Sequence, residues 1–207
     1  MFEPHDQRGA QAVQRRALAG MTGWEDLHRL LEYGDGPLQV GQLPQPVEPG
    51  ETVTLRMTFT VKLPEVFARM GYKGDFYMIG QWFPKLAVYE PAGTRGRAEE
   101  GWNAHQYHGN SEYYADFAIF NVKIRVPAGF VVAATGFQPK PAAEDKRTGT
   151  KTYHFYADDV HDFAWAASPN FIYAEEPYSA RNVPGVKIKL YLDPAHLELK
   201  ERYLRAA

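Results

Sequence analysis

The chain has 207 residues, of which 44% are hydrophobic and 14% aromatic, enough to bury the core of one large domain or two small ones. The 13 tyrosines and 12 phenylalanines favour strands over helices. Because 23 basic residues nearly balance 25 acidic ones, we expect no binding to nucleic acid. The absence of cysteine excludes disulfides, thiolate metal sites and a cysteine nucleophile.

Two further signals concern membranes and export. No stretch approaches the roughly 18 apolar residues that a membrane span requires, so we expect none. The first residues, MFEPHD, lack the basic-then-apolar pattern of a signal peptide. The protein is therefore expected to be cytoplasmic, or exported with its signal already removed.

Residues 1–40 are predicted to form a helical or irregular segment. Residues 7–18 and 24–33 are compatible with short helices, and Gly20 and Gly34 suit helix ends.

Residues 41–193 are predicted to form one β domain. The clearest pattern lies in residues 52–61, where apolar side chains alternate strictly with threonines and Arg56, as in a half-buried strand. Further strands are expected at residues 76–82, 113–126, 130–135, 152–156, 163–167 and 186–192. In the last of these, the lysines should mark a solvated face. Short strands joined by Pro/Gly turns favour a mainly β fold, an antiparallel sandwich or curved sheet, and residues 139–150 should form a hairpin tip.

The last segment, residues 194–207, is predicted to be helical. Asp193 suits an N-cap and Pro194 the first helical position. Leu197, Tyr203 and Leu204 would be available for packing. Because the pattern has no C-cap glycine, we expect a truncated helix.

A first candidate metal site contains His105, His108 and Glu112, with Asp116 one turn further on. On a helix these side chains would share one face and could bind a metal ion. However, residues 109–111 (GNS) would break such a helix, and in an extended chain His105 and Glu112 would be about 20 Å apart. We therefore favour a loop and strand without metal.

A second candidate is the acidic segment around His161, which contains Asp158, Asp159 and Asp162. Carboxylates beside a histidine could bind a cation or orient a base. More often, such residues satisfy backbone amides where a strand begins. The sequence contains no G-x-S-x-G, P-loop, G-x-G-x-x-G or H-E-x-x-H motif, so no self-contained active site is predicted.

Three long motifs carry a resemblance to a known family. They are residues 76–89 (FYMIGQWFPKLAVY), residues 101–117 (GWNAHQYHGNSEYYADF) and residues 159–165 (DVHDFAW). In this order the motifs resemble those of bacterial members of the aminopeptidase-N family of zinc metallopeptidases. The resemblance covers roughly residues 43–207.

The resemblance implies a saddle-shaped, mostly antiparallel N-terminal β domain, followed in the full-length protein by a thermolysin-like catalytic domain. That second domain would supply the H-E-x-x-H motif and the zinc, and residues 194–207 would lead into it. This chain would then hold no catalytic residue and no cofactor. Its partners would be its own catalytic domain and a peptide substrate.

One family role falls inside this chain. In that family a Glu or Gln, nine residues before the proline of an FP or LP step, helps to bind the substrate's N-terminal amine. The resemblance implies this role for Asp75, nine residues before Pro84, through charge-assisted hydrogen bonds. The sequence departs from the family nearby: Gly80 stands where many members have arginine, and two residues are added before Glu90. Asp75 could instead be a turn residue after Gly74.

Three functions follow from these observations. The first is a non-catalytic domain that packs on the catalytic domain of a zinc aminopeptidase and lines the pocket for the substrate's N-terminus. The second is a free-standing β-sandwich module that binds a ligand with exposed tyrosine and tryptophan side chains. The third is a domain of a family member that has lost peptidase activity.

Overall fold

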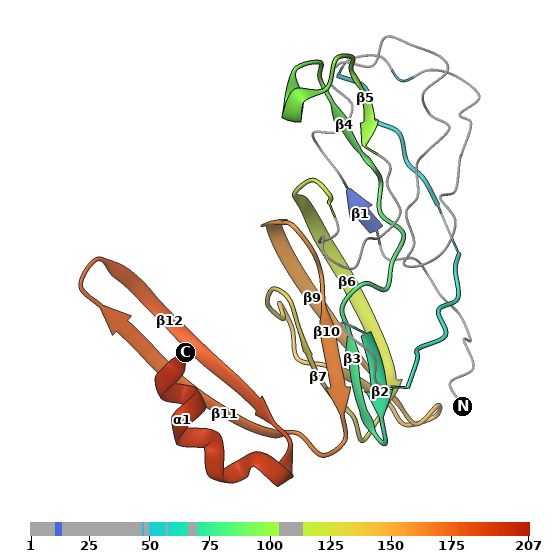
Figure 1. The fold of residues 1–207 in the computed structure, drawn as a ribbon. Helices are drawn as coiled ribbons and strands as arrows, with labels where there is room; N and C mark the ends of the chain where they lie inside the picture. Colours follow the sequence, from blue (N-terminus) through green and yellow to red (C-terminus); the bar gives the residue numbers. More distant parts are fainter. Residues whose placement is uncertain (1–10, 14–46, 48–49, 57, 66–69, 104–113) are drawn as a thin grey trace.

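The computed structural model describes residues 11–13, 47, 50–56, 58–65, 70–103 and 114–207. These residues form a mainly β fold with antiparallel sheets and one short C-terminal α-helix, which confirms the predicted fold class. Two four-stranded sheets pack into a sandwich, and a long hairpin projects from its side (Figure 1).

The first sheet has the strand order β1-β6-β9-β8 and the second the order β2-β3-β10-β7. The first contains β1 (Gln11–Val13), β6 (Ala118–Pro127), β9 (Thr150–Val160) and β8 (Ala143–Asp145). The second contains β2 (Met70–Lys73), β3 (Phe76–Ile79), β10 (Trp165–Ser168) and β7 (Val131–Ala134). Two hairpins complete the fold: β4 (Val88–Glu90) with β5 (Gly101–Asn103), and β11 (Ile172–Ala180) with β12 (Val183–Leu192).

The core lies between the two sheets. On β6 every second side chain is buried, because alternate residues of a strand point to opposite faces. The buried cluster joins these side chains to others from β7, β9 and β10, and Phe163 in its interior has no exposed surface.

The N-terminal expectation is wrong where the structure describes it. Gln11–Val13 form a strand that pairs with β6, although residues 7–18 were expected to be helical. The rest of residues 1–40 lies outside the described residues. Pairing along the edge of β6 supplies the backbone partners that decide the conformation of these three residues.

The predicted strand at residues 52–61 is also wrong for the residues that the structure describes. Residues 51–56 and 58–64 belong to no strand. The alternation predicts relative exposure only in part: Val53, Phe59 and Val61 are half-buried and the described threonines between them are exposed, but Leu55 is exposed as well. Amphipathic periodicity therefore identified a face, but it did not supply a partner for the backbone.

The other predicted strands are confirmed with shifted ends, as β3, β6, β7, β9, β10 and β12. The predicted hairpin tip at residues 139–150 is confirmed, because β8 pairs with the start of β9 around a turn. The structure adds β2, β4, β5, β8 and β11, which the sequence did not predict.

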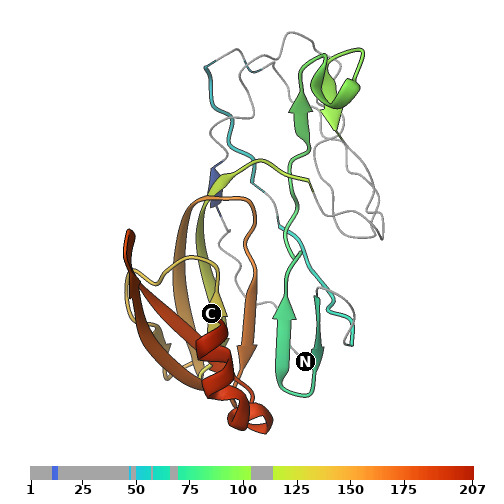
Figure 2. The ribbon, with the colours of Figure 1, turned by 60° about the vertical axis from the view of Figure 1, so that its left-hand side comes forward.

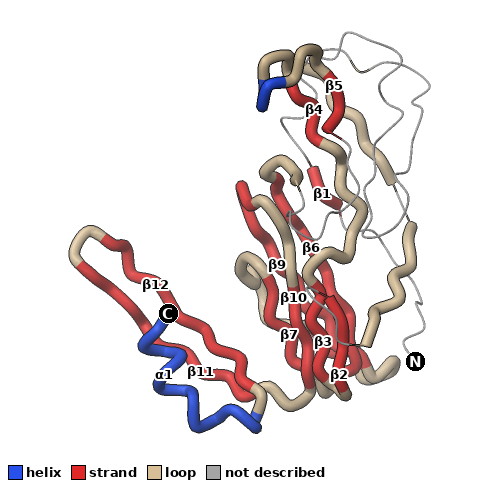
Figure 3. The backbone as a smooth tube through the Cα atoms, in the orientation of Figure 1, coloured by secondary structure: helices blue, strands red, loops and turns tan. Residues whose placement is uncertain are grey.

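The β11–β12 hairpin stands beside the sandwich as a separate two-stranded sheet (Figures 1 and 3). Its base is fixed by Phe171, whose ring packs against Phe76 of β3 at 6.0 Å and against Tyr191 of β12 at 5.9 Å. Aromatic pairs at such distances contribute about 0.5–1.5 kcal/mol each beyond the area that they bury. The hairpin therefore has an anchored base and a projecting tip.

The register divides the hairpin into two faces. The face that we call the lysine face carries Tyr173, Glu175, Pro177, Lys187, Lys189 and Tyr191. The other, which we call the apolar face, carries Ile172, Ala174, Glu176, Tyr178, Val186, Ile188, Leu190 and Leu192. Both lysines are exposed, as expected for a solvated face, whereas Leu192 is buried at the base of the apolar face.

The chain ends in a short helical segment that lies across this hairpin (Figure 2). The Asp193 side chain accepts a hydrogen bond from the Ala195 amide and Pro194 follows it, which confirms the predicted cap. A 3-10 turn (Pro194–Leu199) precedes α1 (Lys200–Ala206). Of the three side chains expected to pack, only Leu204 is buried; Leu197 and Tyr203 are exposed.

Candidate functional site

Asp75 lies in the two-residue turn that joins β2 to β3, since Lys73 pairs with Phe76 on either side of it. Gly74 precedes it with a φ of 55°, a conformation that favours glycine. The Asp75 residue is exposed. This position agrees with the turn interpretation, while a role in binding a substrate amine stays a prediction.

The first candidate metal site cannot be placed. His105, His108 and Glu112 lie outside the described residues, and only Asp116 is described, as a half-buried loop residue ahead of β6. Among the described residues, no three His, Asp or Glu side chains are grouped so that they could hold a metal ion.

The acidic segment around His161 contributes a structural ion pair. Asp162 Oδ2 accepts a hydrogen bond from Lys85 Nζ at 2.8 Å and a second, short one from Gln81 Nε2. Its other oxygen accepts the Phe163 amide at 2.7 Å. Lys85 is only 8% exposed. The carboxylate therefore neutralises a buried ammonium and caps a strand start, which is the structural role that the sequence left open.

The same contact joins two of the sequence motifs. The indole nitrogen of Trp82 donates to the Phe163 carbonyl at 3.0 Å, and its ring meets that of Trp165 edge to face at 6.5 Å. Phe83 packs against Phe120 of the opposite sheet at 5.5 Å. The core is therefore stabilised by contacts between two segments that lie far apart in the chain, residues 81–85 and 162–165.

The other members of the acidic segment, His161, Asp158 and Asp159, lie on the surface. The His161 side chain is exposed and packs edge to face on Phe117, with ring centroids 5.9 Å apart. Asp158 and Asp159 are exposed as well, and Asp159 has a φ of 52° within β9, where the register with β6 shifts.

The sequence missed a buried carboxylate, Glu90 on β4, which is 2% exposed. Arg97 and Arg95 approach it at 3.4 and 3.7 Å, and Arg95 also lies 4.1 Å from the ring centroid of Tyr114. Burial, and then the neighbouring Glu90, raise the pKa of Tyr114, whereas Arg95 opposes them. Two arginines on one carboxylate form a structural network that fixes the β4–β5 hairpin.

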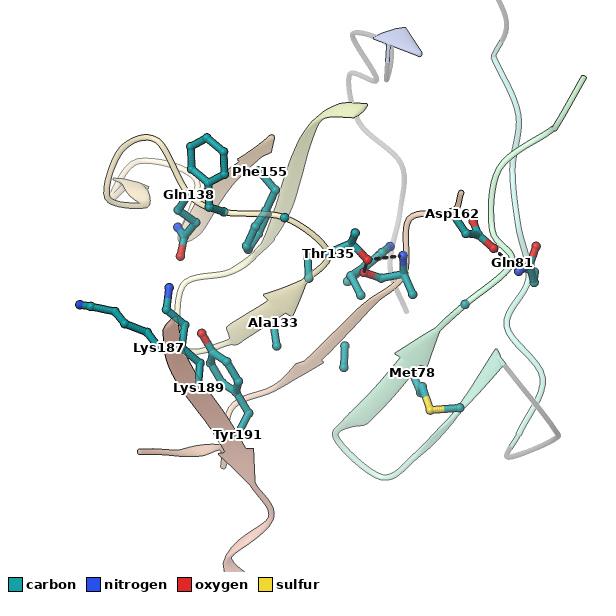
Figure 4. Close-up of a pocket in the computed structure, with 17 residues that line it drawn as sticks. Met78, Gln81, Ala133, Thr135, Gln138, Phe155, Asp162, Lys187, Lys189 and Tyr191 are labelled. Carbon is teal, nitrogen blue, oxygen red and sulfur yellow. Dashed lines mark hydrogen bonds between the residues drawn. The ribbon is translucent and has the colours of Figure 1, made fainter. Parts of the chain in front are cut away.

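A cleft of about 830 Å³ opens between the sandwich and the lysine face of the β11–β12 hairpin (Figure 4). One side is formed by six consecutive residues, 133–138, which run from β7 towards the other sheet. Lys187, Lys189 and Tyr191 form the opposite side. Gln138 and these hairpin side chains lie at one end, and Gln81 with Asp162 at the other.

The polar groups of the cleft differ in how they are neutralised. Lys187 donates to Glu175 at 2.8 Å, and this contact lowers the pKa of the carboxyl. Asp162 is already paired with Lys85. Lys189 makes no ion pair within 4 Å with any described residue. Burial raises the pKa of Tyr191, so this hydroxyl keeps its proton at neutral pH.

The cleft could not be foreseen from the sequence, because its sides come from segments about fifty residues apart. The alternation of lysines in β12 was the one available signal, and it indicated a solvated face. What only the structure adds is that this face looks towards the sandwich.

Fold and site together define a β-sandwich domain with a projecting hairpin and an open cleft. No helix in the described part of the chain is long and apolar enough to cross a membrane. No family model matches the chain, and no curated protein or solved structure is detectably similar to it. The resemblance to the aminopeptidase-N family therefore stays a prediction from the motifs.

Proposed function

We propose that this chain is the non-catalytic β domain of a zinc aminopeptidase-like metallopeptidase, and that it packs on the catalytic domain and borders the pocket for the substrate's N-terminus. The observation that carries the proposal is the exposed apolar surface of the projecting unit, by which we mean the β11–β12 hairpin together with the helical segment that follows it. Ten large apolar side chains are exposed among the described residues, and six of them belong to the hairpin and the helical segment. Such a concentration is typical of an interface.

The position of these side chains supports the same interpretation. Tyr178 and Val186 are cross-strand neighbours near the tip of the apolar face, and they are 49% and 45% exposed. Leu197 and Tyr203 are exposed on the helical segment. A domain that covered the hairpin and the helical segment would remove this apolar surface from water. Such burial stabilises a contact by about 25 cal/mol per Å² of apolar surface.

The motifs of the resemblance support a scaffold role. The side chains of residues 81–85 and 162–165 are occupied with one another and with the core. They stabilise the sandwich from which the hairpin projects. A domain of this kind positions a partner and leaves the chemistry to it.

The decisive experiment compares the isolated chain with the complete product of its gene. The complete product should hydrolyse chromogenic amino-acid amides and hold about one zinc ion, which a chelator should remove together with the activity. The dialysed chain should do neither. Tightly held zinc in the isolated chain, or a gene product without H-E-x-x-H, would contradict the proposal.

The interface can be tested in the complete product by placing a charge on the apolar face. Val186→Glu should lower the activity and the melting temperature, because a carboxylate would be buried between the domains. Phe117→Glu is a matched control, since Phe117 is 60% exposed on the sandwich. Equal effects of the two variants would show that the apolar face is not an interface.

Asp75 is tested in the same complete enzyme. If it binds the substrate ammonium, Asp75→Ala should remove a contact worth about 1.5–3 kcal/mol and lower kcat/KM roughly 10- to 150-fold. The melting temperature should hardly change, because Asp75 is exposed in a turn. Unchanged kcat/KM in an active enzyme would restrict Asp75 to its place in the turn.

The second candidate function, a free-standing binding module, is favoured by the open cleft. It differs from the first in one measurable respect: the gene would encode no metallopeptidase domain, and the isolated chain would bind its ligand unaided. A family member without zinc ligands would resemble the first candidate in its domain contacts and lack the activity.

A further inference from the structure

The backbone along one side of the cleft has hydrogen-bonding groups that no described strand uses. β7 pairs only with β10 among the described residues, so its other edge is open. The Thr135 amide donates to the Ala164 carbonyl at 3.0 Å, towards β10. Because the amides of alternate residues in an antiparallel ladder point to opposite sides, the N–H and C=O of Ala134 point away from β10.

The open backbone continues beyond β7. Phe137 exchanges two backbone hydrogen bonds with Tyr156 of the other sheet, each 2.9 Å long. Gly136 makes this crossing possible: its φ is 85°, and a Cβ there would lie 2.2 Å from the Tyr156 carbonyl oxygen. By the same alternation, the backbone groups of Gln138 point away from Tyr156. All of these residues line the cleft except Tyr156.

The cleft has room for an additional strand. Small side chains line the cleft beside this edge: Ala133 and Ala166 are direct neighbours on the outer face of β7 and β10, and Ala134 lies at the edge itself. An extended segment that followed residues 133–138 would be about 20 Å long. The cleft volume of about 830 Å³ lies within the range of known ligand sites.

The charge at one end of the cleft indicates which kind of peptide segment could bind there. Lys189 makes no ion pair within 4 Å with a described residue, and Figure 4 shows it at the same end of the cleft as Gln138 and Tyr191. Asp162 is matched by Lys85, and the single carboxylate of Glu175 is shared by Lys187, which pairs with it, and by Lys189, which lies opposite it across the hairpin. One positive charge is therefore left in excess at this end of the cleft. A peptide carboxylate placed here would form an ion pair with Lys189 and accept hydrogen bonds from neutral donors.

We infer that the cleft binds an extended, acidic peptide segment of another protein, which adds a strand to the open edge at Ala134 and places a carboxylate at Lys189. Main-chain hydrogen bonds provide affinity in this mode of recognition, and alternate side chains provide specificity. The inference does not depend on the proposed function, because it concerns the lysine face of the hairpin and not the apolar face.

The test uses the purified chain and a fluorescein-labelled octapeptide of alternating valine and glutamate. Fluorescence anisotropy should show saturable binding, and an octapeptide of alternating valine and lysine should not bind. Lys189→Glu should weaken binding roughly tenfold or more, since it reverses the charge at the carboxylate site. Lys123→Glu, the same change on an exposed residue of β6 in the other sheet, should leave binding within about twofold.

Strand addition is separated from simple charge attraction by removing backbone donors. Ala134→Pro should abolish binding while the chain still folds, because proline is tolerated on an edge strand where its missing N–H faces solvent. An octapeptide that is N-methylated at alternate amides should fail to bind the unchanged protein, which tests the same point without a variant. In hydrogen exchange, the acidic octapeptide should protect amides in residues 134–138.

Three results would overturn the inference. Binding of the N-methylated octapeptide equal to that of its parent would exclude strand addition. Equal binding by the Lys189→Glu and unchanged chains would exclude the charge site. A dimer of the chain that Ala134→Pro dissociates would assign the open edge to a second copy.

Discussion

The sandwich and the projecting hairpin are built from the same kind of strand, but they are stabilised in different ways. In the sandwich, β6 and β9 bury one face against the opposite sheet, and the ion pair between Lys85 and Asp162 is itself largely buried. In the hairpin, most side chains of β11 are exposed, and its ion pair, between Glu175 and Lys187, lies in solvent. A two-stranded sheet has marginal stability by itself. The sandwich therefore supplies rigidity, while the hairpin supplies accessible surface for contacts.

The largest effect is expected in the core. Phe163 has no exposed surface and packs on Phe120 with ring centroids 5.6 Å apart. Phe163→Ala should lower the free energy of unfolding by about 3–5 kcal/mol, because it leaves a cavity between the sheets. Urea denaturation of both proteins measures this. Phe117→Ala, at an exposed aromatic residue, should change little, and a similar loss in both variants would contradict the assignment of the core.

A slightly smaller effect is expected from breaking the buried ion pair. Asp162→Ala removes the carboxylate that neutralises the buried Lys85 ammonium, and should cost about 3 kcal/mol. The additional substitution Lys85→Met removes the buried charge and should recover part of this loss. A double variant that is less stable than Asp162→Ala alone would show that Lys85 stabilises the fold through its other contacts.

In the projecting unit, a core substitution should act locally. Leu204 is 5% exposed, and α1 contacts β12. Leu204→Ala should destabilise the docking of the helix by about 2–3 kcal/mol. Hydrogen exchange should become faster in β12, while amides of β6 and β9 should keep their protection. Uniformly faster exchange in all strands would mean that hairpin and sandwich unfold as one unit.

The smallest effect on stability is expected from the exposed ion pair between Glu175 and Lys187. Hydrogen bonds from Lys187 and then Tyr173 hold the pKa of Glu175 below its ordinary value of 4.5. A lowered folded-state pKa stabilises the fold above the ordinary pKa, and this contribution is lost as the pH falls through the folded-state value. Glu175→Gln should therefore change the melting temperature by less than about 2 °C at pH 7, and the difference should vanish in acid. A difference that grew as the pH fell would contradict this sign.

The tyrosine beside this carboxylate gives a spectroscopic readout of the same contact. The Tyr173 hydroxyl donates to Glu175, and this hydrogen bond raises the pKa of Tyr173 to about 12. Glu175→Gln should return that ionisation towards 10.0, the ordinary value. Ultraviolet absorbance of tyrosinate during an alkaline titration follows the change, and Tyr173→Phe identifies the signal. An unchanged titration would show that the hairpin tyrosine does not hold this contact in solution.

Features that depend on neighbours in the chain could be predicted from the sequence. Alternating apolar residues predicted the buried face of β6, turn residues predicted the tip between β8 and β9, and Asp193-Pro194 predicted the start of the last helical segment. In each case the physical cause is local: strand periodicity, turn geometry or an N-cap.

The tertiary structure decided which segments meet. Residues 52–56 and 58–61 alternate clearly, yet they belong to no described strand, whereas β11, with charged and proline residues in its centre, pairs along its length with β12. Gln11–Val13 became a strand because β6 offers an edge. The ion pair between Lys85 and Asp162, and the cleft beside Lys189, join residues far apart in the chain. Periodicity identifies the side of a segment that is buried, but backbone and charge partners are set by packing between distant segments, which a local pattern does not contain.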